Sequence, residues 1–328
     1  MYNYKVDLVK VWASIAVVLI HVTAFLPNYD KDTLGNYMWY RPLLNVAVPF
    51  FFGVSGYLLS RKPKNYFKKY YRNIALMFFI YSAFYAVFDG VLMLIKHQSF
   101  ELALKEWWQQ RGWLSLINGA WGQYHLWFLF ALMIASGVFG YLYTKGISSR
   151  TIFIVAIAID VIYWLFFRET ILSQVFKYGG VIKGFVFVSM GYYLEEHDPP
   201  FNVTKYPIII AGIIYILIFN YCSSPLVSEL TLMGVTFLLL TNVIHTPGQE
   251  TWLSQWSDYS MQIYILHVVF IKIVQLYGEV SLWNMVKNDL LYTFLLLAMC
   301  VIGSILVYPW IERWVYKPAK ELIVEENS

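Results

Sequence analysis

Long apolar segments alternate with short polar segments along the whole chain. Most of the apolar segments have about 17–25 residues, the length that an α-helix needs to cross the hydrocarbon core of a bilayer. The pattern therefore predicts an all-α polytopic membrane protein with about ten transmembrane helices. The predicted spans are residues 6–26, 42–60, 73–95, 122–143, 151–167, 179–195, 206–220, 226–243, 259–276 and 290–311.

The predicted spans leave no room for a separate soluble domain, so we interpret residues 1–328 as a single integral-membrane domain. The longest loop, 96–121, contains the segment ELALKEWWQQ, which can lie in the membrane interface as a short amphipathic helix. Composition agrees, because 59% of the residues are hydrophobic and only 13% are charged. We expect a multi-pass protein of the cell membrane that is surrounded by lipid and has no nucleic-acid partner.

The loop at 61–72 predicts the orientation of the chain. It contains six lysines and arginines and no acidic residue, and short loops of this kind stay in the cytoplasm. Two spans precede it, so the N-terminus is predicted to be cytoplasmic, and an even span number returns the C-terminus to the same side. A second interpretation of the loop, as a docking surface for a phosphorylated donor or anionic lipid, stays open.

The first span carries two residues that can bear charge, Lys10 and His21. Eleven residues are almost three helical turns, which puts both side chains on one face, about 16 Å apart. Ionisable residues inside a membrane are costly and are candidates for function. Simpler interpretations are that Lys10 snorkels to the headgroups and pairs with Asp7, and that His21 is a neutral packing residue.

The second span is interrupted by helix-breaking and small residues. Pro49 predicts a kink, because it cannot donate a backbone hydrogen bond, and Ser55 and Gly56 permit close packing or close approach of a ligand. Arg41 and Asn45 begin this span four residues apart, and therefore share a face. We expect both at the outer side of the membrane.

Further polar residues interrupt the later spans. His125 is predicted at the outer interface, where it either lines a site or belongs to an aromatic belt with neighbours such as Trp127. His267 is predicted near the middle of the bilayer, where an imidazole needs a partner or a cavity. Asp160 and Lys183 are intramembrane charges that we expect to pair with each other or with another helix.

Four segments resemble the integral-membrane acyltransferase-3 family in the order in which that family has them. VDLVKVWASIAVVLIHV is similar to its opening helix, VPFFFGVSGYLL to its second helix, HLWFLF to its mid-chain signature and IYILHVVFI to its late signature. The chain looks most like the freestanding branch of the family, which acetylates sugars of surface polysaccharides.

The resemblance implies a donor, an acceptor and a catalytic residue. The donor is an acyl-CoA, usually acetyl-CoA, and the acceptor is a hydroxyl of a saccharide or lipid-linked glycan. His21 matches the essential histidine of the family. Lys10 and Asn45 stand where the family usually has arginines, and Arg41, one turn from Asn45, is the candidate to replace the second of these.

The expected mechanism is O-acyl transfer across the membrane. The thioester would approach near Lys10, Ser55 and Gly56, while His21 would act as a general base or carry the acyl group. The residues expected to shape or support the acceptor side are Arg41, Asn45, His125, Trp127, Tyr264 and His267. We expect acyl-CoA as a co-substrate, no bound cofactor, and no metal, because Cys222 and Cys300 show no metal-ligand spacing.

Two other interpretations remain open at the level of sequence. A small-solute transporter, for an amino acid such as serine, would also have about ten spans with interrupted helices and intramembrane charges. An inactive scaffold subunit of a polysaccharide export complex would explain why Lys10 and Asn45 replace the arginines of the family.

Overall fold

The computed structural model of the chain describes residues 2–24, 39–97, 99–176, 180–198, 203–277, 286 and 289–325. These residues form helices joined by turns and loops, and no strand occurs among them, which confirms the all-α prediction. The main helices are α1 (Tyr4–Thr23), α3 (Arg41–Asn45), α4 (Ala47–Ser60), α5 (Tyr66–His97), α6 (Phe100–Gln109), α7 (Trp113–Ile117), α8 (Trp127–Thr144), α9 (Ser149–Ile162), α11 (Gly180–Glu196), α12 (Lys205–Tyr221), α13 (Pro225–His245), α14 (Ser260–Tyr277), α16 (Asp289–Ile311) and α17 (Lys317–Glu325).

Within the described residues, eight helical segments are long and apolar enough to cross a membrane, which confirms a polytopic membrane fold. The two other predicted spans, 179–195 and 206–220, correspond to α11 and α12, which have only 17 residues each. Helix α11 is largely enclosed by protein, because Val188 and Met190 are 0% exposed. Ten crossings and cytoplasmic termini therefore stay predictions.

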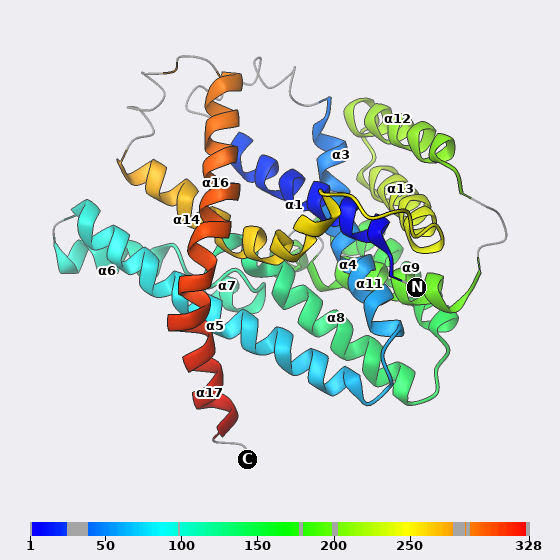
Figure 1. The fold of residues 1–328 in the computed structure, drawn as a ribbon, viewed down its shortest axis with the longest axis horizontal. Coiled ribbons are helices and arrows are strands. Elements are labelled where there is room, and N and C mark those ends of the chain that lie inside the picture. The colour runs from blue at the N-terminus through cyan, green and yellow to red at the C-terminus, as the bar shows by residue number, and fades with distance from the viewer. Residues whose placement is uncertain are drawn as a thin grey trace.

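The predicted kink in the second span is a break between two helices. Helix α3 ends at Asn45 and α4 begins at Ala47. Pro49 explains the position of the break, because it has no N–H to donate to the carbonyl of Asn45, four residues earlier. Figure 1 shows α3 leading directly into α4.

Helices α4 and α11 cross closely enough for their backbones to touch. A Cβ atom added to Gly56 would lie 2.0 Å from the carbonyl oxygen of Val188, and one added to Gly191 would lie 1.8 Å from that of Gly53. Only glycine fits at such a crossing. The crossing ties α4 to the middle of the bundle, where α8 also packs against α11.

An ion network ties α5 to α14 and to the loop between α6 and α7. The carboxylate of Asp89 accepts hydrogen bonds from Arg111 (2.6 Å) and from Lys272 (2.7 Å). The side chains of Asp89 and Arg111 are each only 4% exposed. The segment ELALKEWWQQ forms helix α6, as expected, and its place in the membrane interface stays a prediction. Helix α6 lies alongside α5 (Figure 1) and exposes Trp108.

Helices α12 and α13 form a hairpin at one edge of the molecule, and α16 runs along another side (Figure 1). Helix α1 packs between these parts, in contact with α3, α4, α14 and α16. The last turn of α1 therefore faces several helices at once. This turn carries His21.

Candidate active site

Three histidines from three distant segments meet at the end of α1. His21 comes from the last turn of α1, His125 from the short helix η1 (Tyr124–Leu126) that precedes α8, and His267 from the middle of α14. The ring centroids of His21 and His267 are 4.9 Å apart, and those of His125 and His267 are 5.2 Å apart. We call these three residues the histidine cluster.

The hydrogen bonds of His267 determine where the protons of the cluster lie. Its Nδ1 atom is 3.0 Å from the carbonyl oxygen of Ile263 and 2.8 Å from that of Tyr264. Carbonyl oxygens only accept, so Nδ1 of His267 carries a proton and Nε2 of the neutral ring is an acceptor. Nδ1 of His21, 2.8 Å from this Nε2, is then the donor. Neutral His21 consequently keeps Nε2 unprotonated, as a base requires.

His125 is fixed from several sides. Its Nε2 atom lies 3.2 Å from the carbonyl oxygen of Ile265, which also accepts a hydrogen bond of 2.6 Å from the hydroxyl of Tyr85. The hydroxyl of Tyr264 donates to the backbone carbonyl of His125 over 2.6 Å. Nε2 faces a carbonyl oxygen and carries the proton of the neutral ring, so Nδ1 is an acceptor, and it is buried without a hydrogen-bond partner in the described part of the chain.

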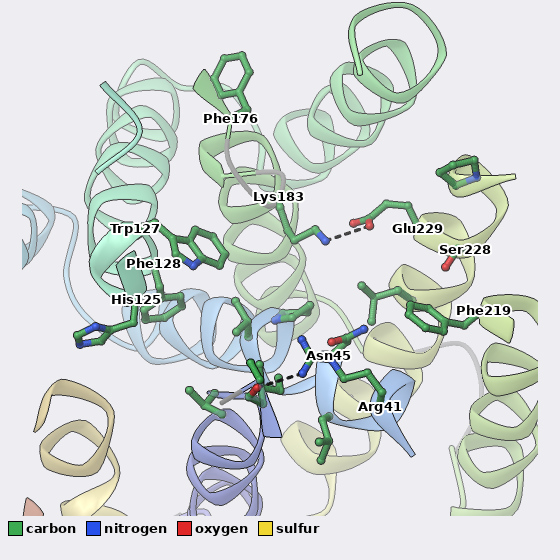
Figure 2. A pocket seen from close by; sticks show the side chains of 18 of the residues that line it. Arg41, Asn45, His125, Trp127, Phe128, Phe176, Lys183, Phe219, Ser228 and Glu229 are labelled. Atoms are coloured by element: carbon green, nitrogen blue, oxygen red, sulfur yellow. Dashed lines mark hydrogen bonds and ion pairs between the residues drawn. The ribbon is translucent and has the colours of Figure 1, made fainter. Parts of the chain in front are cut away.

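The cluster borders a cavity of about 1090 Å³. Figure 2 shows His125 and Trp127 on one side of it and the pair of Lys183 and Glu229 farther along the wall. The guanidinium of Arg41 donates to the carbonyl oxygen of Ile20, the residue before His21, over 3.2 Å. Arg41 lines the cavity as well. Of the residues expected from sequence, the cavity wall contains His21, Arg41, Asn45, His125, Trp127 and Tyr264.

Unlike His21 and His125, His267 does not line the cavity. It is 0% exposed, and its contact is with His21. It therefore supports the residue at the cavity wall rather than the cavity itself. The sequence analysis expected a partner or a cavity for His267, and His21 is that partner. The location of His267 near the middle of the bilayer stays a prediction.

The three residues expected on the donor side are not among those that line the cavity. Nζ of Lys10 is 3.2 Å from Oδ1 of Asp7, the pairing that the simpler interpretation predicts. Ser55 donates to the carbonyl oxygen of Phe51 over 2.8 Å, and Gly56 packs against the backbone of α11. A role of Lys10, Ser55 and Gly56 in donor binding stays a prediction.

Glu229 is a buried charged residue of the wall that the sequence analysis missed. Lys183 pairs with Glu229 of another helix, at 3.0 Å, and this confirms the second of the two pairings expected for it. Glu229 carries the same signal as Asp160, an acidic residue within a predicted apolar span. Its place close to the start of that span made it resemble an interfacial residue.

The arrangement can remove a proton from a ligand in the cavity. His21 offers an unprotonated nitrogen, and its other nitrogen is held by His267. No three or more His, Cys, Asp or Glu residues are grouped to hold a metal ion in the described ranges. The cluster therefore has the features of a general-base site.

Comparisons with known proteins agree with this chemistry. A family model described as an acyltransferase domain, that of the acyltransferase-3 family, matches residues 3–309. The match includes the histidine cluster and every residue that lines the cavity. No curated protein and no solved structure gives a significant match to the chain.

Proposed function

This chain belongs to the integral-membrane acyltransferase-3 family, and from that premise we propose that it moves an acyl group from cytoplasmic acyl-CoA to a saccharide hydroxyl at the cell surface. Membership makes the chain a membrane acyltransferase in general terms. Acetyl is the proposed acyl group and the cell membrane is the proposed location. The observation that carries the proposal is the hydrogen bond from His21 to His267 at the edge of a large cavity.

In the proposed reaction His21 acts as the general base. Its Nε2 takes the proton of the acceptor hydroxyl while the hydroxyl oxygen attacks the thioester carbonyl. The C–S bond then breaks, the coenzyme A thiolate leaves, and the thiolate receives the proton from His21. A transient acyl group on the same nitrogen is the covalent variant of this mechanism.

His267 supports this step without touching the reacting atoms. When His21 takes a proton its ring becomes positive, and Nε2 of His267 already accepts a hydrogen bond from that ring. The proton on Nδ1 of His267 is directed to the carbonyl oxygens of Ile263 and Tyr264. This preorganised chain of dipoles stabilises charge that develops on His21.

The cavity supports a saccharide as the acceptor. Its volume of about 1090 Å³ is slightly larger than that of ordinary ligand sites, which have roughly 300–1,000 Å³. Its wall combines aromatic rings, among them Trp127 and Trp164, with polar groups such as Asn45 and Ser228. Aromatic faces pack on the C–H faces of a sugar ring, while polar groups bind its hydroxyls.

The predicted orientation places this cavity on the outer side. Apart from Tyr264 in the ninth predicted span, the cavity residues that lie in predicted spans belong to the ends of the first, fifth and seventh and to the beginnings of the second, fourth, sixth and eighth. With a cytoplasmic N-terminus, all of these are outer ends. The donor would enter from the opposite side, past the basic loop 61–72, and deliver its thioester towards His21.

Comparison of surface glycan from different strains tests the proposal. Glycan from cells that lack this gene, from complemented cells and from cells with His21→Ala would be analysed by mass spectrometry. We expect the mass increment of one acetyl group in complemented cells alone, with equal amounts of protein in the membrane fraction. Identical glycan masses in all three strains would contradict acyl transfer to the surface and favour the transporter interpretation.

A further inference from the structure

The pair of Lys183 and Glu229 joins two helices at the cavity wall. Both residues lie near the beginnings of their helices, α11 and α13. Nζ of Lys183 is 3.0 Å from Oε2 of Glu229, and the two side chains are only 13% and 7% exposed. Both line the cavity, and Figure 2 shows the pair well separated from His125. The pair is thus positioned to contact a part of the ligand away from the reacting atoms.

One oxygen of the pair has no partner. Lys183 binds Oε2 of Glu229, while Oε1 is buried without a hydrogen bond to any described residue. A buried carboxylate oxygen without a donor is costly, and in native proteins such an atom calls for an explanation. Because Glu229 lines the cavity, a hydroxyl of a bound ligand would supply the missing donor.

The charges at the wall favour a neutral ligand. Among the described residues that line the cavity, three are basic and two are acidic: Arg41, Arg168, Lys183, Glu169 and Glu229. Asp160, 1% exposed, lies behind the wall and interacts electrostatically with Glu229 and Lys183. The five residues of the wall alone have a net formal charge of only +1. A phosphate-rich molecule such as coenzyme A needs a net positive site, so this part of the cavity does not suit the donor.

The cavity wall that contains the pair of Lys183 and Glu229 also contains aromatic rings. Tyr163, Trp164, Tyr215 and Phe219 line the same cavity as Glu229. The combination of flat aromatic faces with a strong hydrogen-bond acceptor is the usual composition of a site for a sugar ring.

We propose that Glu229, held by Lys183, is the specificity-determining residue for the acceptor: its free oxygen accepts a hydrogen bond from a hydroxyl of a neutral saccharide. This inference rests on the proposed transfer to a saccharide. A ligand bound at Glu229 is fixed at a distance from His21, and this selects the hydroxyl that reaches Nε2 of His21. Such positioning contributes to rate because it places the reacting atoms in register.

Glu229→Gln tests this role with little change of shape. Lys183 donates, so it retains the carbonyl oxygen of the new amide, and the NH₂ group takes the place of the free oxygen. The site then offers a donor where the ligand hydroxyl donates. Glu101→Gln is the matched control, because Glu101 is an exposed residue of α6 and is not among the residues that line the cavity.

The assay uses the full-length protein in detergent, acetyl-CoA as donor, and surface glycan from cells that lack the gene as acceptor. For Glu229→Gln we expect the KM for glycan to rise about tenfold or more, as for loss of a hydrogen bond to a charged group. We expect an unchanged KM for acetyl-CoA and unchanged release of coenzyme A in the absence of glycan. Glu101→Gln should stay within about twofold of wild type.

Two outcomes overturn the inference. One is an unchanged KM for glycan in Glu229→Gln, and the other is an equal rise of the KM for acetyl-CoA, which would make the pair part of the donor site. If Glu229→Gln does not fold, the double variant with Lys183→Gln removes both charges together and takes its place.

Failure of the proposed function gives a different result. The wild-type protein would then transfer no acetyl group to glycan. Binding of the same glycan, followed by tryptophan fluorescence, decides the present inference in that case. It stands if Glu229→Gln weakens binding about tenfold, and it falls if binding is equal or absent in both proteins.

Discussion

Nδ1 of His21 lies 2.8 Å from Nε2 of His267, although 246 residues separate the two histidines in the chain. The contact joins α1 to α14 and makes one histidine the hydrogen-bond acceptor of the other. It also gives the two residues different roles, since His21 borders the cavity and His267 is enclosed by protein. His21 is the proposed catalytic residue, and His267 is a positioning residue.

Replacement of His21 by alanine is expected to abolish acyl transfer. A positioned general base contributes about 10²–10⁴-fold to rate, so the activity of His21→Ala should fall at least about 100-fold. The measurement is acetyl transfer from acetyl-CoA to glycan by equal amounts of purified protein. The melting temperature in detergent serves as the folding control. A folded variant with wild-type transfer would exclude His21 as the base.

Two replacements of His267 separate positioning from packing. His267→Gln keeps a donor for the carbonyl oxygen of Ile263 and an acceptor for His21, whereas His267→Phe fills similar space without either. We expect about tenfold loss of kcat for the glutamine variant and about 100-fold loss for the phenylalanine variant. The KM for glycan should change little, because His267 lies outside the cavity. Equal losses in two folded variants would indicate a purely structural role.

The sequence predicted the members of the site better than their grouping. His21, His125 and His267 were each visible because an imidazole in an apolar span needs a partner. Spacing within one span predicts which residues share a face, as it did for Arg41 and Asn45, which both line the cavity. It says nothing about which spans touch, because that depends on crossing angles and on close glycine contacts between helices.

The helix interruption was predictable because it depends on one residue of the local sequence, whereas the pairing of helices depends on tertiary contacts. Pro49 removes a local hydrogen bond, and the break at Val46 follows from that single residue. Glu229 was missed because its ion pair with Lys183 joins two helices through tertiary packing. Its position near the start of a predicted span gave no reason to prefer a buried location to an interfacial one.

The crossing of α4 and α11 should tolerate no side chain at Gly191. A Cβ atom there would lie 1.8 Å from the carbonyl oxygen of Gly53, so Gly191→Ala forces the two backbones apart. Overpacking typically costs about 1–3 kcal/mol, and we expect the melting temperature in detergent to fall by about 3 °C or more. Gly234→Ala is the control, since a Cβ atom at Gly234 meets no atom within 4 Å. Equal melting temperatures of the two variants would refute the close crossing.

The ion network around Asp89 should be sensitive to loss of its single negative charge. Asp89→Asn leaves the buried Arg111 and the partly buried Lys272 without their common partner. Removal of one member of a buried ion pair costs about 3–5 kcal/mol, so a large drop in thermal stability is expected. Asp258→Asn, at an exposed position, should leave stability unchanged. The double variant with Lys272→Met should recover part of the loss, and no recovery would show that Lys272 does not depend on Asp89.

Lys10→Arg tests whether the lysine of the first helix replaces an arginine. In the wild-type protein, Nζ of Lys10 is 3.2 Å from Oδ1 of Asp7, and an arginine retains this pairing. It also adds a planar group that binds phosphate with two hydrogen bonds. We expect activity to be preserved or raised, with an equal or lower KM for acetyl-CoA, while Lys10→Met should raise that KM about tenfold through loss of a charged contact. The KM for glycan should be the same in both variants, because Lys10 lies apart from the acceptor cavity. Complete loss of activity in a folded Lys10→Arg protein would show that Lys10 does not stand in for arginine, and an unchanged KM in Lys10→Met would remove it from the donor site.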